Sequence, residues 1–124
     1  MFDSCSLLVS LDLSSFDTSN VSNMFNLFGN CSSLVSLDLS SFDTSNLKSA
    51  AAMFSNCKSL VSLNLSNFDM SNATKYTNIF QYCKKLTHIK CKQSFKDWCI
   101  TNQDTILLPT AMREGGSGTW EIIV

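Results

Sequence analysis

The chain has 124 residues, of which 44% are hydrophobic and 15% are charged, and its formal net charge at pH 7 is −1. This length is enough for one domain with a hydrophobic core. The near-neutral charge, without a dense arginine cluster or interleaved aromatic and basic residues, argues against a nucleic-acid-binding protein.

The sequence repeats with a period of 26 residues, which defines the units 1–26, 27–52, 53–78 and 79–104. Cysteine recurs at Cys5, Cys31, Cys57 and Cys83, and phenylalanine at Phe2, Phe28, Phe54 and Phe80. A period of about 20–29 residues that carries L-x-x-L-x-L is typical of leucine-rich-repeat proteins. Because the chain begins in the middle of a unit, we expect it to be the C-terminal piece of a longer protein.

Each unit contains one short stretch in which apolar and polar residues alternate, which predicts a strand with one buried face. In the second unit the inward residues are Leu34, Leu37, Leu39 and Phe42, and the outward residues are Ser36, Asp38 and Ser40. About 20 residues separate successive strands, too many for a hairpin, so the strands should pair in parallel.

The opposite side of each unit is predicted to begin with a turn at Asp-Thr-Ser-Asn (17–20 and 43–46) and to continue as a helix, with an irregular outer side as the alternative. The expected helical stretches are 23–30, 48–56 and 74–82. Their apolar spacing, as in Val21, Met24, Phe25 and Phe28, predicts that these side chains are buried. A second buried column of stacked rings is expected from Phe16, Phe42 and Phe68.

Residues 93–124 depart from the repeat and are predicted to form a β-rich cap. Within it, 94–101 predicts a short helix with Phe95 and Trp98, while 105–108 and 119–124 predict a hairpin. The first unit has no comparable cap, so its end is expected to fray or to pair with another copy. The fold class is therefore α/β: a right-handed leucine-rich-repeat solenoid with a parallel sheet (1–92) and a C-terminal cap (93–124).

The repeated motif resembles that of the BspA-like leucine-rich-repeat surface proteins of bacteria. The motif is best kept in the second unit, at Phe28, Cys31, Leu34, Leu37, Asp38, Leu39, Ser40, Phe42, Asp43, Thr44, Ser45 and Asn46. The resemblance covers residues 1–92, and a Trp-containing tail such as 120–124 is also typical of these proteins. It implies a secreted or surface-attached protein that adheres to matrix, plasma or bacterial proteins, and it supplies no catalytic residues.

Three outward columns on the predicted sheet form the candidate binding face. Its members are Ser36, Asp38, Ser40, Ser62, Asn64, Ser66, His88, Lys90 and Lys92, continued in the first unit by Ser10, Asp12 and Ser14. Neighbours in a column should lie about 4.8 Å apart. This arrangement predicts a flat polar stripe that is acidic at one end and basic at the other; the alternative is a stripe that is merely solvated.

Other chemistry finds less support in the sequence. Asp12 and Asp38 should be neighbours, but a hard cation needs about six oxygen ligands and a glycosidase needs a cleft. The only histidine, His88, has lysines rather than a nucleophile beside it. The four periodic cysteines are interpreted as free buried thiols, while Cys91 and Cys99 leave a free pair or a disulfide open.

The sequence therefore predicts a non-enzymatic protein-binding module without a metal or cofactor, outside the cell or on its surface. The expected partners are host matrix, plasma or microbial surface proteins, with no nucleic acid and no membrane insertion. Self-association through the first unit is a further expectation. The alternative is a structural spacer whose repeats bind nothing.

Overall fold

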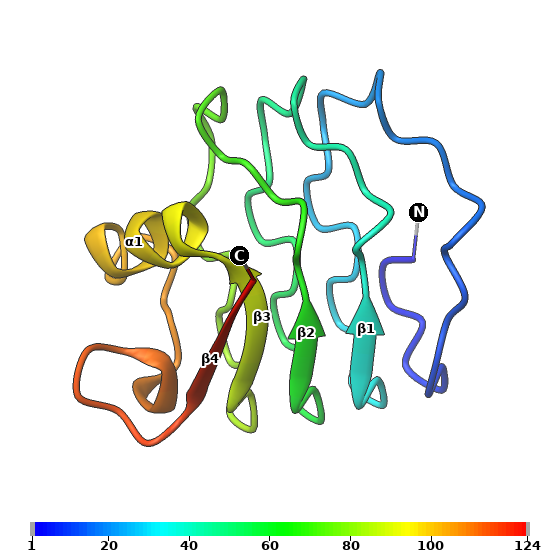
Figure 1. Cartoon of the computed structure of the whole chain (residues 1–124). Coiled ribbons are helices and arrows are strands. Elements are labelled where there is room, and N and C mark those ends of the chain that lie inside the picture. The colour runs from blue at the N-terminus through cyan, green and yellow to red at the C-terminus, as the bar shows by residue number, and fades with distance from the viewer. Residues whose placement is uncertain (1, 124) are drawn as a thin grey trace.

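The computed structural model of the chain describes residues 2–123. Its elements are strands β1 (Ser36–Asp38), β2 (Ser62–Asn64) and β3 (His88–Lys92), helix α1 (Gln93–Thr101), a short 3₁₀ turn (Thr110–Met112) and strand β4 (Thr119–Ile123). The strands form one parallel sheet in the order β1-β2-β3-β4, as Figure 1 shows. Met1 and Val124, which the sequence analysis placed in the first unit and the last strand, lie outside the described residues.

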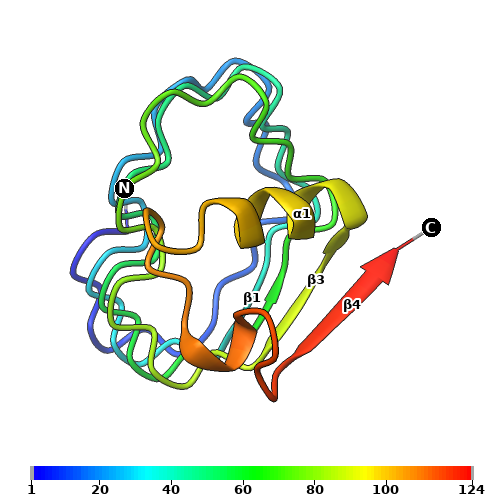
Figure 2. The ribbon, with the colours of Figure 1, turned by 90° about the vertical axis from the view of Figure 1, so that its left-hand side faces the viewer.

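The 26-residue period becomes the register of the sheet. Leu37 pairs with Leu63, and Leu63 pairs with Ile89, so equivalent residues of successive units lie side by side. Seen along the row of strands, the units follow nearly the same path through space (Figure 2). The predicted parallel strands are confirmed in the second, third and fourth units.

The core lies between the sheet and the opposite segments of the units. Phe2, Phe28, Phe54 and Phe80 form a column of stacked rings, with centroids 5.5, 5.8 and 5.7 Å apart in turn. The expected stack of Phe16, Phe42 and Phe68 is wrong as a stack: Phe42 and Phe68 are buried, but Phe16 is 38% exposed. Phe68 instead meets Phe95 edge-on, with ring centroids 5.9 Å apart.

The helices predicted at 23–30, 48–56 and 74–82 are absent from the described chain. In these stretches alternate amides donate to the next unit rather than to the carbonyl four residues back: Met24 N–H to Ser49 O (2.8 Å) and Ala50 N–H to Lys75 O (2.9 Å). Turns with positive φ at Asn26, Ala52 and Asn78 also interrupt any helix. Lateral hydrogen bonding thus overrides helix propensity, and Phe25, predicted to be buried, is 61% exposed.

The first unit lacks the strand that the sequence predicts for it. Within the described residues no strand precedes Ser36, so the outward positions Ser10, Asp12 and Ser14 do not extend the sheet. Leu7 is 90% exposed and Val9 is 59% exposed; Val35 and Val61, which are equivalent to Val9 in the next two units, are also exposed, at 46% and 38%.

The C-terminal segment keeps its predicted helix but not its predicted hairpin. Helix α1 begins one residue before the expected 94–101, and it lies across the end of the stacked units in Figure 2. Strand β4 pairs in parallel with β3, whereas residues 105 and 106 accept hydrogen bonds from Asn78 (2.9 Å) and Phe80 (3.0 Å). Residues 93–123 therefore cap the core and also extend the sheet by one strand.

None of the helices in residues 2–123 is both long and apolar enough to cross a membrane.

Candidate binding surface on the sheet

Two polar rows cross the exposed face of the sheet. The strand register places Ser36, Ser62, His88 and Thr119 in the first row, and Asp38, Asn64, Lys90 and Glu121 in the second. The rows face outward because the residue between them in each strand is buried: Leu37, Leu63 and Ile89 are at most 3% exposed. Six of the nine predicted site residues thus share one surface, about 4.8 Å from strand to strand.

The remaining three predicted residues do not form a third row of that sheet. Ser40 and Ser66 follow the ends of β1 and β2, and their hydroxyls donate to Asp38 (2.6 Å) and to Asn64. Their backbone amides donate to the same side-chain oxygens, at 2.9 and 3.1 Å. Lys92 lies at the end of β3, opposite Ile123. Ser40 and Ser66 therefore end the strands rather than offer free hydroxyls to a partner.

This turn changes the acidity of Asp38. The Ser40 hydroxyl, then the Ser40 backbone amide and, to a smaller extent, the charge of Lys90 hold the pKa of the Asp38 carboxyl below its usual range. Asp38 is therefore a carboxylate at neutral pH, and its Oδ1 accepts both Ser40 hydrogen bonds.

Glu121 was missed by the sequence reasoning. Its carboxylate lies 3.0 Å from His88 Nε2 and 3.6 Å from Lys90 Nζ. The alternation Thr119-Trp120-Glu121 was the available signal, but a hairpin was expected there instead of a strand beside β3. The predicted gradient from an acidic to a basic end is wrong at the basic end, because Glu121 adds an acid beyond Lys90.

The centre of the two rows forms a shallow depression of about 230 Å³, lined by Ser36, Leu37, Asp38, Ser62, Leu63, Asn64, His88 and Lys90. Val35 and Val61, 46% and 38% exposed, lie in the residues just before β1 and β2. The hydroxyls of Ser36 and Ser62 make no hydrogen bond to any described residue. The surface therefore offers short donors and acceptors beside apolar groups, in a nearly flat array.

The histidine, acidic residues and cysteines were also compared with what catalysis or metal binding requires. His88 Nε2 is engaged by Glu121, and residues 2–123 hold no cluster of three or more histidine, cysteine or acidic residues able to hold a metal ion. The six cysteines are free thiols, and five of them are buried. Burial raises the pKa of Cys57 to about 12 and of Cys91 to about 11, so these thiols stay protonated at neutral pH.

The periodic thiols have a structural partner. Cys31, Cys57 and Cys83 each place their sulfur 3.0–3.1 Å from the backbone carbonyl of the phenylalanine 29 residues earlier. The cysteine column therefore links each unit to the one before it. Cys91 and Cys99 are both free, without the disulfide that the sequence left open.

Residues 1–106 match the model of one protein family, described as Mycoplasma protein of unknown function, DUF285. The chain belongs to the DUF285 family. The match spans the repeated units, α1 and the segment that pairs with residues 78–80. Neither a curated protein nor a solved structure matches this chain.

Proposed function

We propose that this DUF285 chain is a leucine-rich-repeat solenoid of the BspA-like kind and that it is a protein-binding module, not an enzyme. The polar rows on the sheet are its binding face, and the partner is a host matrix, plasma or microbial surface protein. The proposed location is outside the cell or on its surface. The motif that resembles the BspA-like proteins supports the location and the class of partner.

The observation that carries the proposal is the in-register array of short polar side chains on a rigid sheet. Ser36 and Ser62 lose little side-chain entropy when a partner orders them, since each has a single short side-chain torsion to fix. The buried leucines beneath them hold the backbone in place. A preorganised surface of this kind binds at a lower entropic cost than a mobile loop.

The charges of the second row supply specificity. Asp38 is the anion at the β1 side and makes no ion pair within residues 2–123, whereas Lys90 and His88 share Glu121 at the β4 side. A partner with a basic group opposite Asp38 gains attraction there without breaking an ion pair of this chain. Electrostatic complementarity of this type mainly sets specificity and association rate.

The test is binding of the monodisperse chain to immobilised matrix and plasma glycoproteins and to bacterial cells, at low and high salt. Asp38→Lys should weaken saturable binding by about tenfold or more, and high salt should weaken binding by the unchanged chain. Surface plasmon resonance measures both effects.

Asp43→Lys is the matched control. Asp43 accepts the backbone amide of Ser45 at 2.9 Å, as Asp38 accepts that of Ser40, but Asp43 lies at a turn away from the sheet. Binding that survives Asp43→Lys and falls with Asp38→Lys supports the sheet face. Equal binding by both variants overturns it, and no binding to any probe favours the spacer.

A further inference from the structure

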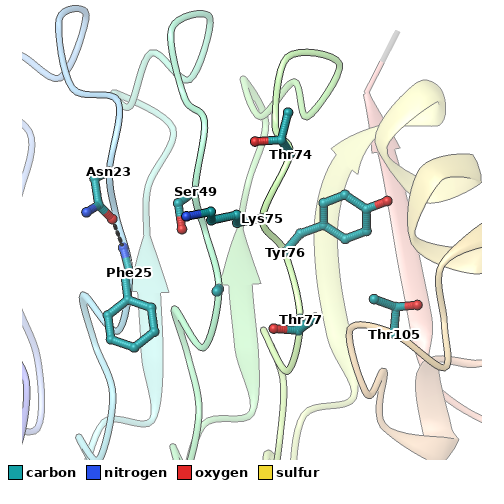
Figure 3. Close-up of a pocket in the computed structure, with 9 residues that line it drawn as sticks. Asn23, Phe25, Ser49, Thr74, Lys75, Tyr76, Thr77 and Thr105 are labelled. Carbon is teal, nitrogen blue, oxygen red and sulfur yellow. Dashed lines mark hydrogen bonds between the residues drawn. The ribbon is translucent and has the colours of Figure 1, made fainter.

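A second hollow lies on the side of the units opposite the sheet (Figure 3). Its volume is about 610 Å³, within the range of roughly 300–1,000 Å³ that ligand pockets occupy. The segments that form it are the stretches where the sequence predicted helices. Because these stretches pair laterally at Asn23, Ser49 and Lys75 instead of forming helices, side chains of three units lie side by side on this surface.

The backbone under the hollow is fixed by lateral pairing. Asn23 bridges Ser49, and Ser49 bridges Lys75, in a parallel row across three units. Phe25, Ala51 and Thr77 form the next outward row at the same 26-residue spacing. Ala51 has the smallest side chain of these three, so the middle of that row is open beside the Phe25 ring.

Aromatic rings stand at two ends of the hollow. Phe25 is 61% exposed, although an apolar ring of this size is usually buried. The backbone amide of Phe25 donates a hydrogen bond to Asn23 Oδ1 at 2.8 Å. Tyr76 is half-buried, and its ring meets Trp98 of α1 edge-on at 5.2 Å between centroids. The backbone of Phe25 and the ring of Tyr76 are therefore held in position, while part of each ring's surface remains open to a ligand.

The hollow is cationic and rich in hydrogen-bond donors. Lys75 is the one charged residue among those that line it, and no acid lines it. Its side chain extends across the hollow toward Ser49 in Figure 3, and it makes no ion pair within residues 2–123. The hydroxyls of Ser49 and Thr77 flank it. Lys48 of the preceding unit is adjacent in the backbone, since its carbonyl accepts the amides of Thr74 and Lys75 at 2.8 and 3.1 Å.

We propose that this hollow, flanked by Phe25 and Tyr76 around Lys75, is a second binding site whose ligand is an acidic peptide segment of a partner protein. A carboxylate of the peptide pairs with the Lys75 ammonium, and an adjacent aromatic or large aliphatic side chain fills the opening over Ala51. Charge complementarity decides for an anionic ligand, and the two ring surfaces require an apolar group beside the charge. The site is on the opposite side from the sheet rows and does not depend on their function.

The test uses an array of acetylated, amidated hexapeptides in which Asp, Gln or Lys is combined with Phe, Leu or Ser. The labelled full chain should bind peptides containing both Asp and Phe or Leu at least tenfold more strongly than the matched Gln or Ser peptides. Lys75→Glu should reverse the charge preference toward the Lys peptides. Phe25→Ala should weaken binding to all apolar peptides while keeping the preference for Asp.

Lys58→Glu is the control, because it makes the same change in net charge at an exposed position that does not line the hollow. It should retain the Asp preference, as should Asp38→Lys on the sheet. Circular dichroism and thermal unfolding are measured for each variant to check that it is folded. A Lys75→Glu chain that keeps the Asp preference, or an unchanged chain that shows no preference across the array, overturns the proposal.

Discussion

At the scale of single residues, short polar side chains shape the turns of the first three units. Asp12, Asp17, Asp38, Asp43 and Asp69 each accept hydrogen bonds from the serine two residues later, which holds the pKa of each carboxyl below its usual value. Asn64 occupies the position equivalent to Asp38 and accepts the Ser66 amide at 3.1 Å. The turn thus needs a side-chain oxygen at this position but not a charge.

Asp38→Asn should therefore keep the stability at pH 7 and reduce its loss in acid. A carboxyl whose pKa is lower in the folded state stabilises the fold above its ordinary pKa of about 3.9, and that contribution is lost as pH falls through the folded pKa. The side-chain amide of Asn does not titrate in this pH range, so the variant has no such contribution to lose at this position. Urea unfolding at pH 7, 4 and 3 measures the difference between variant and unchanged chain.

Four other aspartates with lowered pKa remain in this variant, so the acid sensitivity should become smaller rather than disappear. Parallel stability curves for the two chains from pH 7 to 3 would contradict the prediction. A large loss at pH 7 would show that the charge itself, and not only the acceptor oxygen, holds the turn.

At the scale of elements, the sequence predicts what depends on local alternation and misses what depends on distant pairing. Strands β1 to β3 and α1 could be read from apolar spacing within a few residues. The outer stretches have helical spacing too, but their amides find carbonyls 25 residues ahead, and nothing within one unit reveals this. The strand at 119–123 was predicted, but its pairing with β3, and with it the place of Glu121, was missed for a related reason: His88 pairs with Thr119, a spacing outside the 26-residue period.

The turns of these outer stretches favour residues that accept positive φ. Asn26 and Asn78 have φ values of 57° and 60°, and the equivalent Ala52 has 56°. A non-glycine residue in the left-handed region costs roughly 1–2 kcal/mol, and asparagine tolerates it better than alanine because its side chain hydrogen-bonds locally. Ala52 is therefore strained, whereas the equivalent Asn26 and Asn78 suit this backbone conformation.

Ala52→Asn should raise the free energy of unfolding by about 0.5–1 kcal/mol. The Ala52 amide donates to Thr77 O at 2.9 Å, and the substitution leaves this bond intact. Chemical denaturation measures the gain. The matched control is Ala51→Asn at the neighbouring residue, which is not among the positions with positive φ and should gain nothing. Equal changes in the free energy of unfolding at both positions would show that relief of backbone strain at Ala52 is not the cause.

At the scale of the whole molecule, the core is continuous from unit to unit and is closed at one end by α1. Phe95 of this helix is 4% exposed and lies between Phe68 and Trp98, with centroid distances of 5.9 Å to each ring. Beside it, Cys99 is fully buried. The helix therefore completes the apolar interior of the last unit.

Phe95→Ala should destabilise the whole chain by about 3–5 kcal/mol, a large part of the roughly 5–15 kcal/mol typical of a domain. Urea unfolding followed by Trp fluorescence measures the loss, because Trp98 is one of the neighbours of the removed ring. Ser94→Ala, at an exposed position of the same helix, should change stability little. A loss below about 1 kcal/mol for Phe95→Ala would mean that α1 is not part of the cooperative core.

The stacking of units also determines how the chain would respond to a pulling force. Residue 2 lies in the first unit and residue 123 in β4, at opposite ends of the stack (Figure 1). Among the described residues, the hydrogen bonds between units join adjacent units or join a unit to the C-terminal cap. Tension applied between these ends would break the hydrogen bonds between one pair of adjacent units at a time, rather than those of the whole sheet at once. Each released unit would add 26 residues of slack, roughly 90 Å of extended chain. Such a protein would yield in steps and absorb mechanical work while its remaining units stay folded.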